Sequence, residues 1–282
     1  MATLVEIIGI THNPLLPRML AQLSDDPAMG EIKIDYDLMR ARLAESKPDA
    51  IVVIASDHLN QWFMNNMPAF LVGKSPRAKG PFPHEKRVFG LGDYEAPVNV
   101  ELARWFVSEG FERGVDFAFS EEFVIDHAFT VPMSFVRPEG DIPIVPVWTN
   151  VMAPPLPPAS RFYAVGKALR ELIESSPQDL RVAVVSSGHL AVEVGGPKLA
   201  TASPSVEFDV RMMELIAAGK SDQVVLEASL DNLMAAGNVT PGFLNYVMLI
   251  GLAGGTIPRA TALRHPKATP AVYYMEWTFG GN

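Results

Sequence analysis

The sequence contains no cysteine, which excludes disulfide bonds, thiolate metal ligands and cysteine nucleophiles. It also lacks an excess of basic residues, because 32 acidic side chains outnumber 23 basic ones and the net charge is −9. An acidic chain without a basic stripe is a poor partner for nucleic acid or for an anionic membrane surface. We therefore expect neither nucleic acid nor a membrane among its partners.

Long apolar runs are missing too. The longest, FLNYVMLIGLAGG at 243–255, is shorter than the roughly 18 residues that suggest a membrane span. The N-terminal MATLVEIIGI lacks the cationic start and long apolar centre of a signal peptide. With the absence of cysteine, these features predict a soluble cytoplasmic protein.

Several catalytic motifs are absent as well. The chain has no phosphate-binding G-x-x-x-x-G-K-[ST], no nucleophile elbow G-x-S-x-G and no zinc-binding H-E-x-x-H. A metal site without cysteine would rest on histidine, which suits Fe, Mn or Zn.

Apolar runs of strand length are present throughout, and amphipathic segments alternate with them. The 48% hydrophobic content of 282 residues is enough for a sizeable core. The pattern predicts strands at 4–10, 50–56, 68–73, 142–148, 181–187 and 271–279, and helices at 35–45, 98–110, 159–176, 206–219 and 240–255. This alternation predicts one α/β domain over 1–282, with a central, mostly buried β-sheet flanked by helices.

Local signals refine this outline. Pro146 predicts that its strand is an edge strand or ends there. A Ser at 160 predicts the N-cap of the following helix, and another helix is expected to start at Thr130 to Pro132. Residues 74–97, rich in Gly and Pro, predict a long polar loop of the kind that forms lids or partner contacts.

Three of the six histidines follow directly on predicted strands: His12, His58 and His189. Ligands of open α/β sheets bind beyond the carboxyl ends of the strands, so these side chains are expected to converge on one crevice. His127 precedes a predicted helix, whereas His84 and His265 have no such placement. A single histidine after a strand is more often a loop residue than a ligand, but three at equivalent ends favour a site.

The chain resembles the class III extradiol ring-cleavage dioxygenases of the LigB type, exemplified by the protocatechuate 4,5-dioxygenase β-subunit. The matching segments, in the family's order, are GITHNPLLP (9–17), IASDHLNQWFMNNMPAFLVG (54–73), VIDHAFTVPMSF (124–135), VPVWTNVMAPPLPPASRFYAVGKALR (145–170), GGPKL with EFD (195–209) and AAGNVTPGFLNYVMLIGLAGG (235–255). The resemblance implies a LigB-like α/β fold that holds non-haem Fe(II) through two histidines and a glutamate, leaving positions open for a diol and O₂.

The resemblance also implies roles for single residues. The family's two ligand histidines fall on His12 and His58, and a histidine that helps to position the substrate falls on His127. The acid–base histidine, counted from GGP, is expected at Val192, and His189, three residues earlier, is the histidine available for that work. His189 and His127 are thus the predicted catalytic residues, and no substrate-binding residue is assigned.

The family glutamate has no counterpart. It belongs in AAGNVTPGFLNY, which contains no acidic residue, and Val239 and Gly242 stand where one is expected. Asn238 or Thr240 offers only neutral oxygen, while Glu193 and Glu276 are the carboxylates considered from elsewhere. The loss of this hard anionic ligand implies a weaker site for Fe(II).

We predict an extradiol ring-opening dioxygenase of the EC 1.13.11 class, acting with O₂ on a catechol-like or aminophenol-like aromatic in aromatic catabolism. Its expected assembly is a homo-oligomer, or a hetero-oligomer with a homologous or small subunit. Two alternatives stay open: a non-catalytic homologous subunit that has lost the glutamate, and a metal-dependent enzyme of the same fold that is not an oxygenase. Arg161, Lys198, and the aromatic and Met residues after His58 are weaker candidates for substrate contact.

Overall fold

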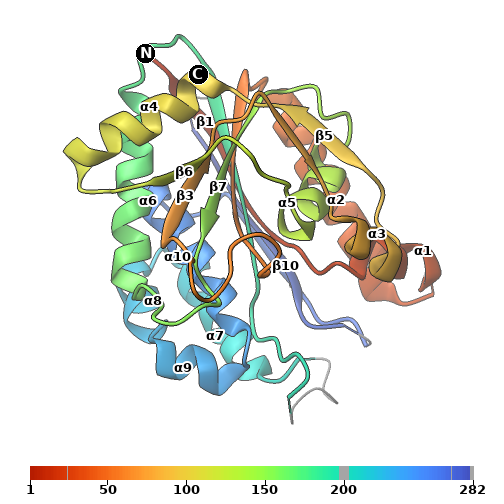
Figure 1. Ribbon diagram of the computed structural model, residues 1–282. Coiled ribbons are helices and arrows are strands. Elements are labelled where there is room, and N and C mark those ends of the chain that lie inside the picture. Colours follow the sequence, from red (N-terminus) through yellow and green to blue (C-terminus); the bar gives the residue numbers. More distant parts are fainter. Residues whose placement is uncertain (24, 197–202, 268, 280–282) are drawn as a thin grey trace.

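A computed structural model describes residues 1–282 except 24, 197–202, 268 and 280–282. Its centre is a mixed eight-stranded sheet (Figure 1). In spatial order the strands are β6 (Ala118–Ser120), β3 (Phe70–Gly73), β7 (Ile144–Thr149), β2 (Ala50–Ser56), β8 (Arg181–Gly188), β1 (Thr3–Thr11), β10 (Val272–Thr278) and β9 (Ala260–Arg264). The predicted single α/β domain with a buried sheet is confirmed.

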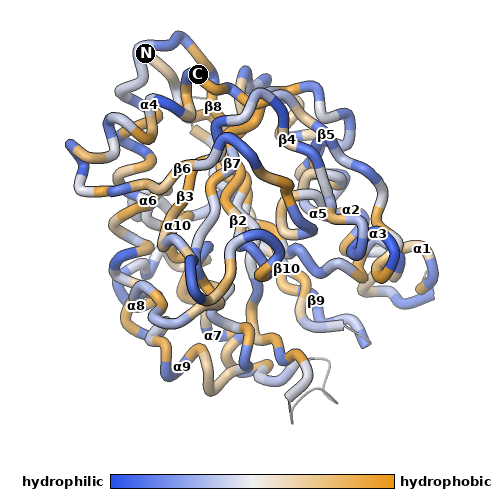
Figure 2. Tube along the Cα trace, in the orientation of Figure 1, coloured by the Kyte–Doolittle hydropathy of each residue, from blue (hydrophilic) through white to orange (hydrophobic). Residues whose placement is uncertain are grey.

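The four central strands, β7, β2, β8 and β1, are parallel, so their carboxyl ends meet at one edge. All residues of β2 are buried, as are all of β8 after its first residue. Strands covered on both faces need continuous Val and Ile runs, which explains why the sequence predicted the bounds of β2 and β8 within one residue. Figure 2 shows the hydrophobic colour along these strands.

Helices cover both faces of the sheet (Figure 1). One face packs against α6 (Ala159–Glu174) and α10 (Leu244–Ala253), and the opposite face against α2 (Pro27–Glu45) and α5 (His127–Val136). The remaining helices are α1 (Leu16–Gln22), α3 (Pro83–Phe89), α4 (Val100–Gly110), α7 (Val206–Ala217), α8 (Ser221–Glu227) and α9 (Leu230–Ala236), with 3₁₀ turns η1 (Phe111–Arg113) and η2 (Thr240–Phe243). None of the helices in the described ranges is long and apolar enough to cross a membrane.

The helices α6 and α10 cross in close contact. A Cβ at Gly166 would lie 1.9 Å from the Met248 carbonyl oxygen, and one at Gly251 would lie 2.2 Å from the Tyr163 carbonyl oxygen. Glycine at both positions therefore lets the two backbones touch. The 3₁₀ turn η2 runs directly into α10.

Several predicted details are wrong. Pro146 lies inside the sheet, between β2 and β3, and is tolerated because the ladder to β3 starts only at Val147. The helix expected from Thr130 already begins at His127, because the Asp126 side chain accepts a hydrogen bond from the Ala128 N–H and caps it.

Two further predictions fail at helix ends. The N-cap of α6 is Pro158 instead of Ser160 and has no side-chain bond. The helix predicted over 240–255 is divided into η2 and α10. The stretch 74–97 is also more ordered than a loop, since it forms the hairpin of β4 (Arg77–Gly80) and β5 (Tyr94–Pro97) around α3.

Candidate metal and ring-cleavage site

Four histidines meet at the carboxyl edge of the central strands. His12 directly follows β1, His189 directly follows β8, and His58 lies two residues beyond β2. Because β2, β8 and β1 are neighbours and parallel, their ends deliver the three imidazoles to one place. The ring centroid of His12 lies 5.1 Å from that of His58 and 4.1 Å from that of His189.

His127 completes the group from a different element. It is the first residue of α5, where Asp126 acts as the N-cap. Its ring centroid lies 4.1 Å from that of His58 and 5.6 Å from that of His12. The four predicted site histidines therefore lie together, while His84 and His265 are exposed elsewhere.

The hydrogen bonds of His12 fix which nitrogen is free. Its Nδ1 lies 2.9 Å from the Ser187 hydroxyl, and that hydroxyl donates to the Ala128 carbonyl at 2.6 Å. Because the hydroxyl proton is already used, the Ser187 oxygen accepts from Nδ1–H of His12. The Nε2 of His12 is then left with a lone pair, and it is buried without a hydrogen-bond partner. A buried nitrogen of this kind, surrounded by other imidazoles, suits a metal ion.

His58 is oriented by a carboxylate. The Nδ1 of His58 lies 2.9 Å from Oδ2 of Asp126, which also accepts from the His58 backbone N–H at 3.0 Å. Nδ1 therefore carries the proton, and Nε2 is available as a ligand, as in the carboxylate–histidine arrangement of many metal sites. Asp57, which directly precedes His58, has a different role from Asp126. Asp57 holds the turn at 60–62, and Asp126 orients His58.

His127 has a carboxylate partner as well. Oε1 of Glu85 lies 2.5 Å from Nδ1 of His127 and also accepts from its backbone N–H. Glu85 is buried and belongs to α3, inside the stretch that the sequence predicted as a loop. Sequence reasoning missed this residue. The signal was present, because Pro83 at the first helical position and Glu85 two residues later are typical of a helix start.

The electrostatics keep most of these imidazoles neutral. Burial, reinforced by the neighbouring imidazoles, lowers the pKa of His189 to about 3 and lowers the pKa of His12 and of His127. Burial also disfavours the charged form of His58, but the Asp126 carboxylate outweighs it and raises the pKa of His58. Neutral imidazoles with exposed lone pairs are what a metal ion or a proton acceptor requires.

Two sets of side chains have the spacing of metal ligands. In the first, the ligand atoms of His12, His58 and His189 all lie within 4.8 Å of one another, and in the second those of His58, Asp126 and His127 do. The Asp126 carboxylate already serves His58 and the end of α5. The first set therefore fits a cation better.

A cavity of about 610 Å³ opens onto the histidines. His58, His127 and His189 line it, and most of its other walls are apolar. The apolar side chains are Pro14, Leu15, Met19, Phe89, Val151, Met152, Val192, Val194, Pro204, Val239, Pro270 and Ala271. Glu193 and Lys267 are its charged lining residues among those described. A mainly apolar wall with a few polar groups is typical of a site for a small aromatic molecule.

Residues 6–275 match the family described as the catalytic LigB subunit of aromatic ring-opening dioxygenase. The chain belongs to the LigB family. A relative from Rhodococcus jostii (strain RHA1) is 30% identical over 250 residues, which cover 86% of this chain and 74% of the relative. One from Escherichia coli (strain K12 / DH10B) is 30% identical over 229 residues, covering 75% and 68%. Both are named 2,3-dihydroxyphenylpropionate/2,3-dihydroxicinnamic acid 1,2-dioxygenase.

The fold has a counterpart among solved structures. The crystal structure of an uncharacterized protein from Escherichia coli K12 matches with a TM-score of 0.60 at 15% identity, covering 96% of this chain and 99% of that one. This similarity supports the LigB-like fold alone. The family and the named relatives support an aromatic ring-cleaving dioxygenase, the class of enzyme that the sequence predicts.

The stretch in which the resemblance predicts a glutamate ligand has no acidic residue, and the two glutamates considered in its place have other partners. Glu276 is buried within β10, opposite Ile8 of β1, and forms an ion pair with Arg42. Glu193 lines the cavity, but its Oε2 accepts a hydrogen bond from the Asn238 N–H at 2.8 Å. Thr240 is buried, and its hydroxyl oxygen accepts from the Val192 N–H at 3.2 Å.

The weaker candidates for substrate contact lie elsewhere. Arg161 donates to the Gly114 carbonyl and does not line the cavity. Trp62 is partly buried and packs against Trp148 at the edge of the core, and Phe63 is exposed. Lys198 lies outside the described residues.

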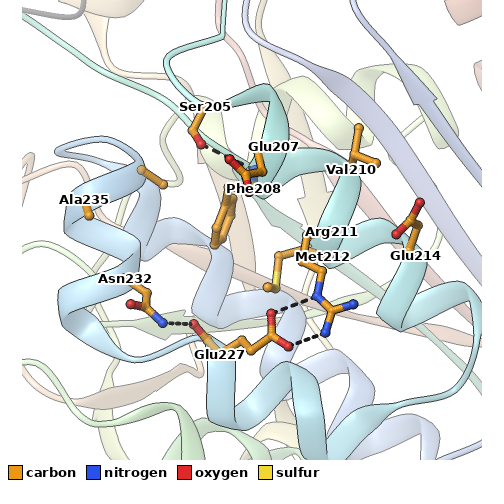
Figure 3. Close-up of a pocket in the computed structure, with 11 residues that line it drawn as sticks. Ser205, Glu207, Phe208, Val210, Arg211, Met212, Glu214, Glu227, Asn232 and Ala235 are labelled. Atoms are coloured by element: carbon orange, nitrogen blue, oxygen red, sulfur yellow. Dashed lines mark hydrogen bonds and ion pairs between the residues drawn. The ribbon is translucent and has the colours of Figure 1, made fainter.

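A second cavity, also about 610 Å³, lies between α7, α8 and α9 (Figure 3). Phe208 and Met212 line it, and Arg211 forms an ion pair with Glu227 at 2.6 Å. The figure shows the charged groups of that pair directed toward each other. None of the described histidines lines this cavity, so the first cavity is the candidate site.

Proposed function

We propose that this LigB chain is an extradiol dioxygenase that opens a catechol-like or aminophenol-like ring with O₂ and uses Fe(II) held by His12 and His58. The observation that carries the proposal is the buried Nε2 of His12, which has no hydrogen-bond partner and lies among imidazoles. Its proton is committed to Ser187 on the opposite side of the ring, so the lone pair faces the cluster. Asp126 likewise accepts the Nδ1 proton of His58, which leaves Nε2 of His58 available as a ligand.

Iron bound there would carry electron density from the substrate's oxygens to O₂. The protein's own contribution begins with the cavity, whose apolar walls accept a planar ring and exclude water from it. The sequence predicts His189 and His127 as the catalytic residues, and both line the cavity. His127 is suited to receive the proton of a substrate hydroxyl, because its Nδ1–H is held by Glu85 and its Nε2 forms no hydrogen bond with the described residues.

The Glu85 carboxylate has a second effect. As His127 takes up a proton, the adjacent negative charge stabilises the imidazolium and holds the ring in one orientation. Lys267, exposed at the cavity, supplies a positive charge suited to an acidic side chain of the substrate. We propose the substrates of the named relatives, which carry a carboxylate, as the first compounds to test.

The wider context is proposed from the sequence. We place the enzyme in the cytoplasm, with a domain that spans 1–282 and acts in aromatic catabolism. We expect it to assemble with copies of itself or with a homologous or small subunit. Light scattering of the purified chain, alone and mixed with candidate subunits, tests that assembly.

The test of function begins with protein purified without oxygen and supplied with Fe(II). A panel of 2,3-dihydroxyphenylpropionate, protocatechuate, catechol and 2-aminophenol is then added with O₂. We expect O₂ uptake and the yellow absorbance of a ring-opened product with at least one compound. H12A is expected to abolish both, whereas H265A, which removes an exposed histidine outside the cluster, is expected to retain them.

The non-catalytic subunit is the second candidate, and the missing glutamate favours it. A chain of that kind would stay inert with every compound after Fe(II) is supplied, and a homologous partner would restore activity. An iron-loaded chain that acts on its substrate without consuming O₂ would instead favour the non-oxygenase alternative.

A further inference from the structure

One of the positions at which the resemblance predicts the glutamate borders the ring of His189. Gly242, one of the two positions where the acidic residue is expected, lies in η2. A Cβ built on Gly242 would lie 3.1 Å from Cδ2 of the His189 ring, 3.6 Å from the His189 nitrogen and 3.7 Å from its Cβ. The imidazole therefore lies directly against the space into which a side chain at 242 would project.

The backbones of β8 and η2 also approach each other closely. A Cβ on Gly188 would lie 2.5 Å from the Gly242 carbonyl oxygen, so the end of β8 and η2 are in contact. His189 is the next residue, and this contact sets where its ring can lie. The ring reaches His12, with 4.1 Å between their centroids.

The hydrogen-bond partners of His127 and His189 indicate different roles for the two rings. His127 has a buried carboxylate on Nδ1, the partner that an acid–base imidazole needs. Among the described residues, no side chain forms a hydrogen bond with the His189 ring, so nothing there stabilises a proton on it. Its nitrogens belong instead to the set of three imidazoles with metal-ligand spacing.

We propose that His189 is the third metal ligand of this chain, so that His12, His58 and His189 form a three-histidine site in place of two histidines and a glutamate. This inference rests on the proposed function for the presence of a metal, and it revises the sequence-based role of His189. Proton transfer then falls to His127 with Glu85.

The exchange of ligand has a chemical consequence. Three neutral imidazoles leave the full charge of a divalent cation uncompensated by protein ligands, whereas a carboxylate would cancel half of it. The site would thus attract a deprotonated substrate oxygen more strongly than its relatives' sites do. This favours substrates that bind as anions.

The experiment measures metal binding, separately from turnover. Calorimetric titration of the whole, metal-free chain with Co(II) under anaerobic conditions should give one tight site. We expect H189A to bind Co(II) at least about 100-fold more weakly than the wild-type chain. Loss of a residue that only contacts a ligand typically costs about 10–100-fold, so a larger loss indicates that His189 is itself a ligand. H127A, the matched control from the same cluster, should bind Co(II) within about threefold of the wild-type chain.

A rescue variant sharpens the test. In H189A/G242E the glutamate enters the space that the imidazole leaves, and we expect it to restore at least about tenfold of the lost affinity. X-ray absorption of the Co(II)-loaded wild-type chain provides a readout that does not depend on variant folding. Three imidazoles in the first coordination shell support the proposal, and two overturn it.

The outcomes separate this inference from the proposed function. Wild-type affinity in H189A, with ring opening retained in the wild-type chain, overturns the three-histidine site and leaves the function standing. A wild-type chain that binds no Co(II) or Fe(II) overturns both. Tight binding that depends on His189, without any ring opening, supports the site and overturns the dioxygenase.

Discussion

Replacing Asp126 with asparagine should weaken metal binding through His58, although Asp126 is not itself a proposed ligand. Oδ2 of Asp126 accepts from Nδ1 and from the backbone N–H of His58, at 2.9 and 3.0 Å, while Oδ1 caps α5 by accepting from Ala128 at 2.9 Å. An asparagine has one acceptor oxygen and one NH₂ group. It can keep the cap or the acceptor for His58, but it cannot keep both.

The magnitude follows from the contact that is lost. With the oxygen kept on the cap, the NH₂ group faces Nδ1 of His58 and favours the tautomer that has its proton on Nε2. The metal must reverse that tautomer, so we expect a 10–100-fold loss of Co(II) affinity, or about 1.4–2.7 kcal/mol. With the oxygen kept on His58, the loss appears instead as about 1 kcal/mol of unfolding free energy.

Titration calorimetry and urea unfolding of D126N distinguish these two results. The matched control is D26N, because Oδ1 of Asp26 caps α2 by accepting from Ala28 at 3.0 Å, Oδ2 accepts from the Lys267 N–H at 3.3 Å, and neither oxygen has a histidine partner. D26N should lose stability without losing metal affinity. If D126N binds Co(II) within twofold of the wild-type chain and is equally stable, the argument about the His58 tautomer is refuted.

Three further predictions concern the site, the core and the response to pH. E85Q should lower kcat for ring opening by about 10–100-fold while leaving Co(II) affinity unchanged, because it weakens the hold on His127; an unchanged kcat would contradict that role. G251A should destabilise the chain by about 3 kcal/mol in urea unfolding, because its methyl group meets a carbonyl of α6. G30A is the control, since a Cβ there contacts nothing within 4 Å, and it should be neutral or stabilising by about 0.5–1 kcal/mol. Burial, with a neighbouring glutamate, raises the pKa of Glu6 from 4.5 to about 8, so the native state holds the proton that the unfolded chain releases. Linkage alone would lower stability by about 3.5 kcal/mol as pH rises from 5 to 8, and solvent screening reduces the expected loss to about 2 kcal/mol. E6Q should flatten that loss in thermal unfolding; parallel pH curves would refute it.

The central strands could be predicted from the sequence because a buried strand is marked by a local run of apolar residues. The strand predicted at 50–56 has those bounds, and the strand predicted at 4–10 is one residue longer at each end. The convergence of the strand-end histidines followed from parallel topology, since neighbouring parallel strands end at one edge. These features depend only on which residues follow a buried run.

What the sequence could not give depends on contacts between distant segments. Asp126 orients His58 across 68 positions, and Glu85 holds His127 across 42. Pro146 argued against a central strand, yet the short ladder of β3 accommodates it. The contact between Gly242 and the His189 ring depends on how η2 packs against the end of β8, which the sequence does not show.

The three strand-end histidines belong to segments that are far apart along the chain but adjacent at the centre of the sheet. A cation held by them would tie β1, β2 and β8 together, so it could not bind an unfolded chain in the same way. By thermodynamic linkage it would stabilise the native state by about 2.7 kcal/mol at a free concentration 100 times its dissociation constant. The metal would then act as a cross-link of the core, in a chain that has no disulfide to supply one.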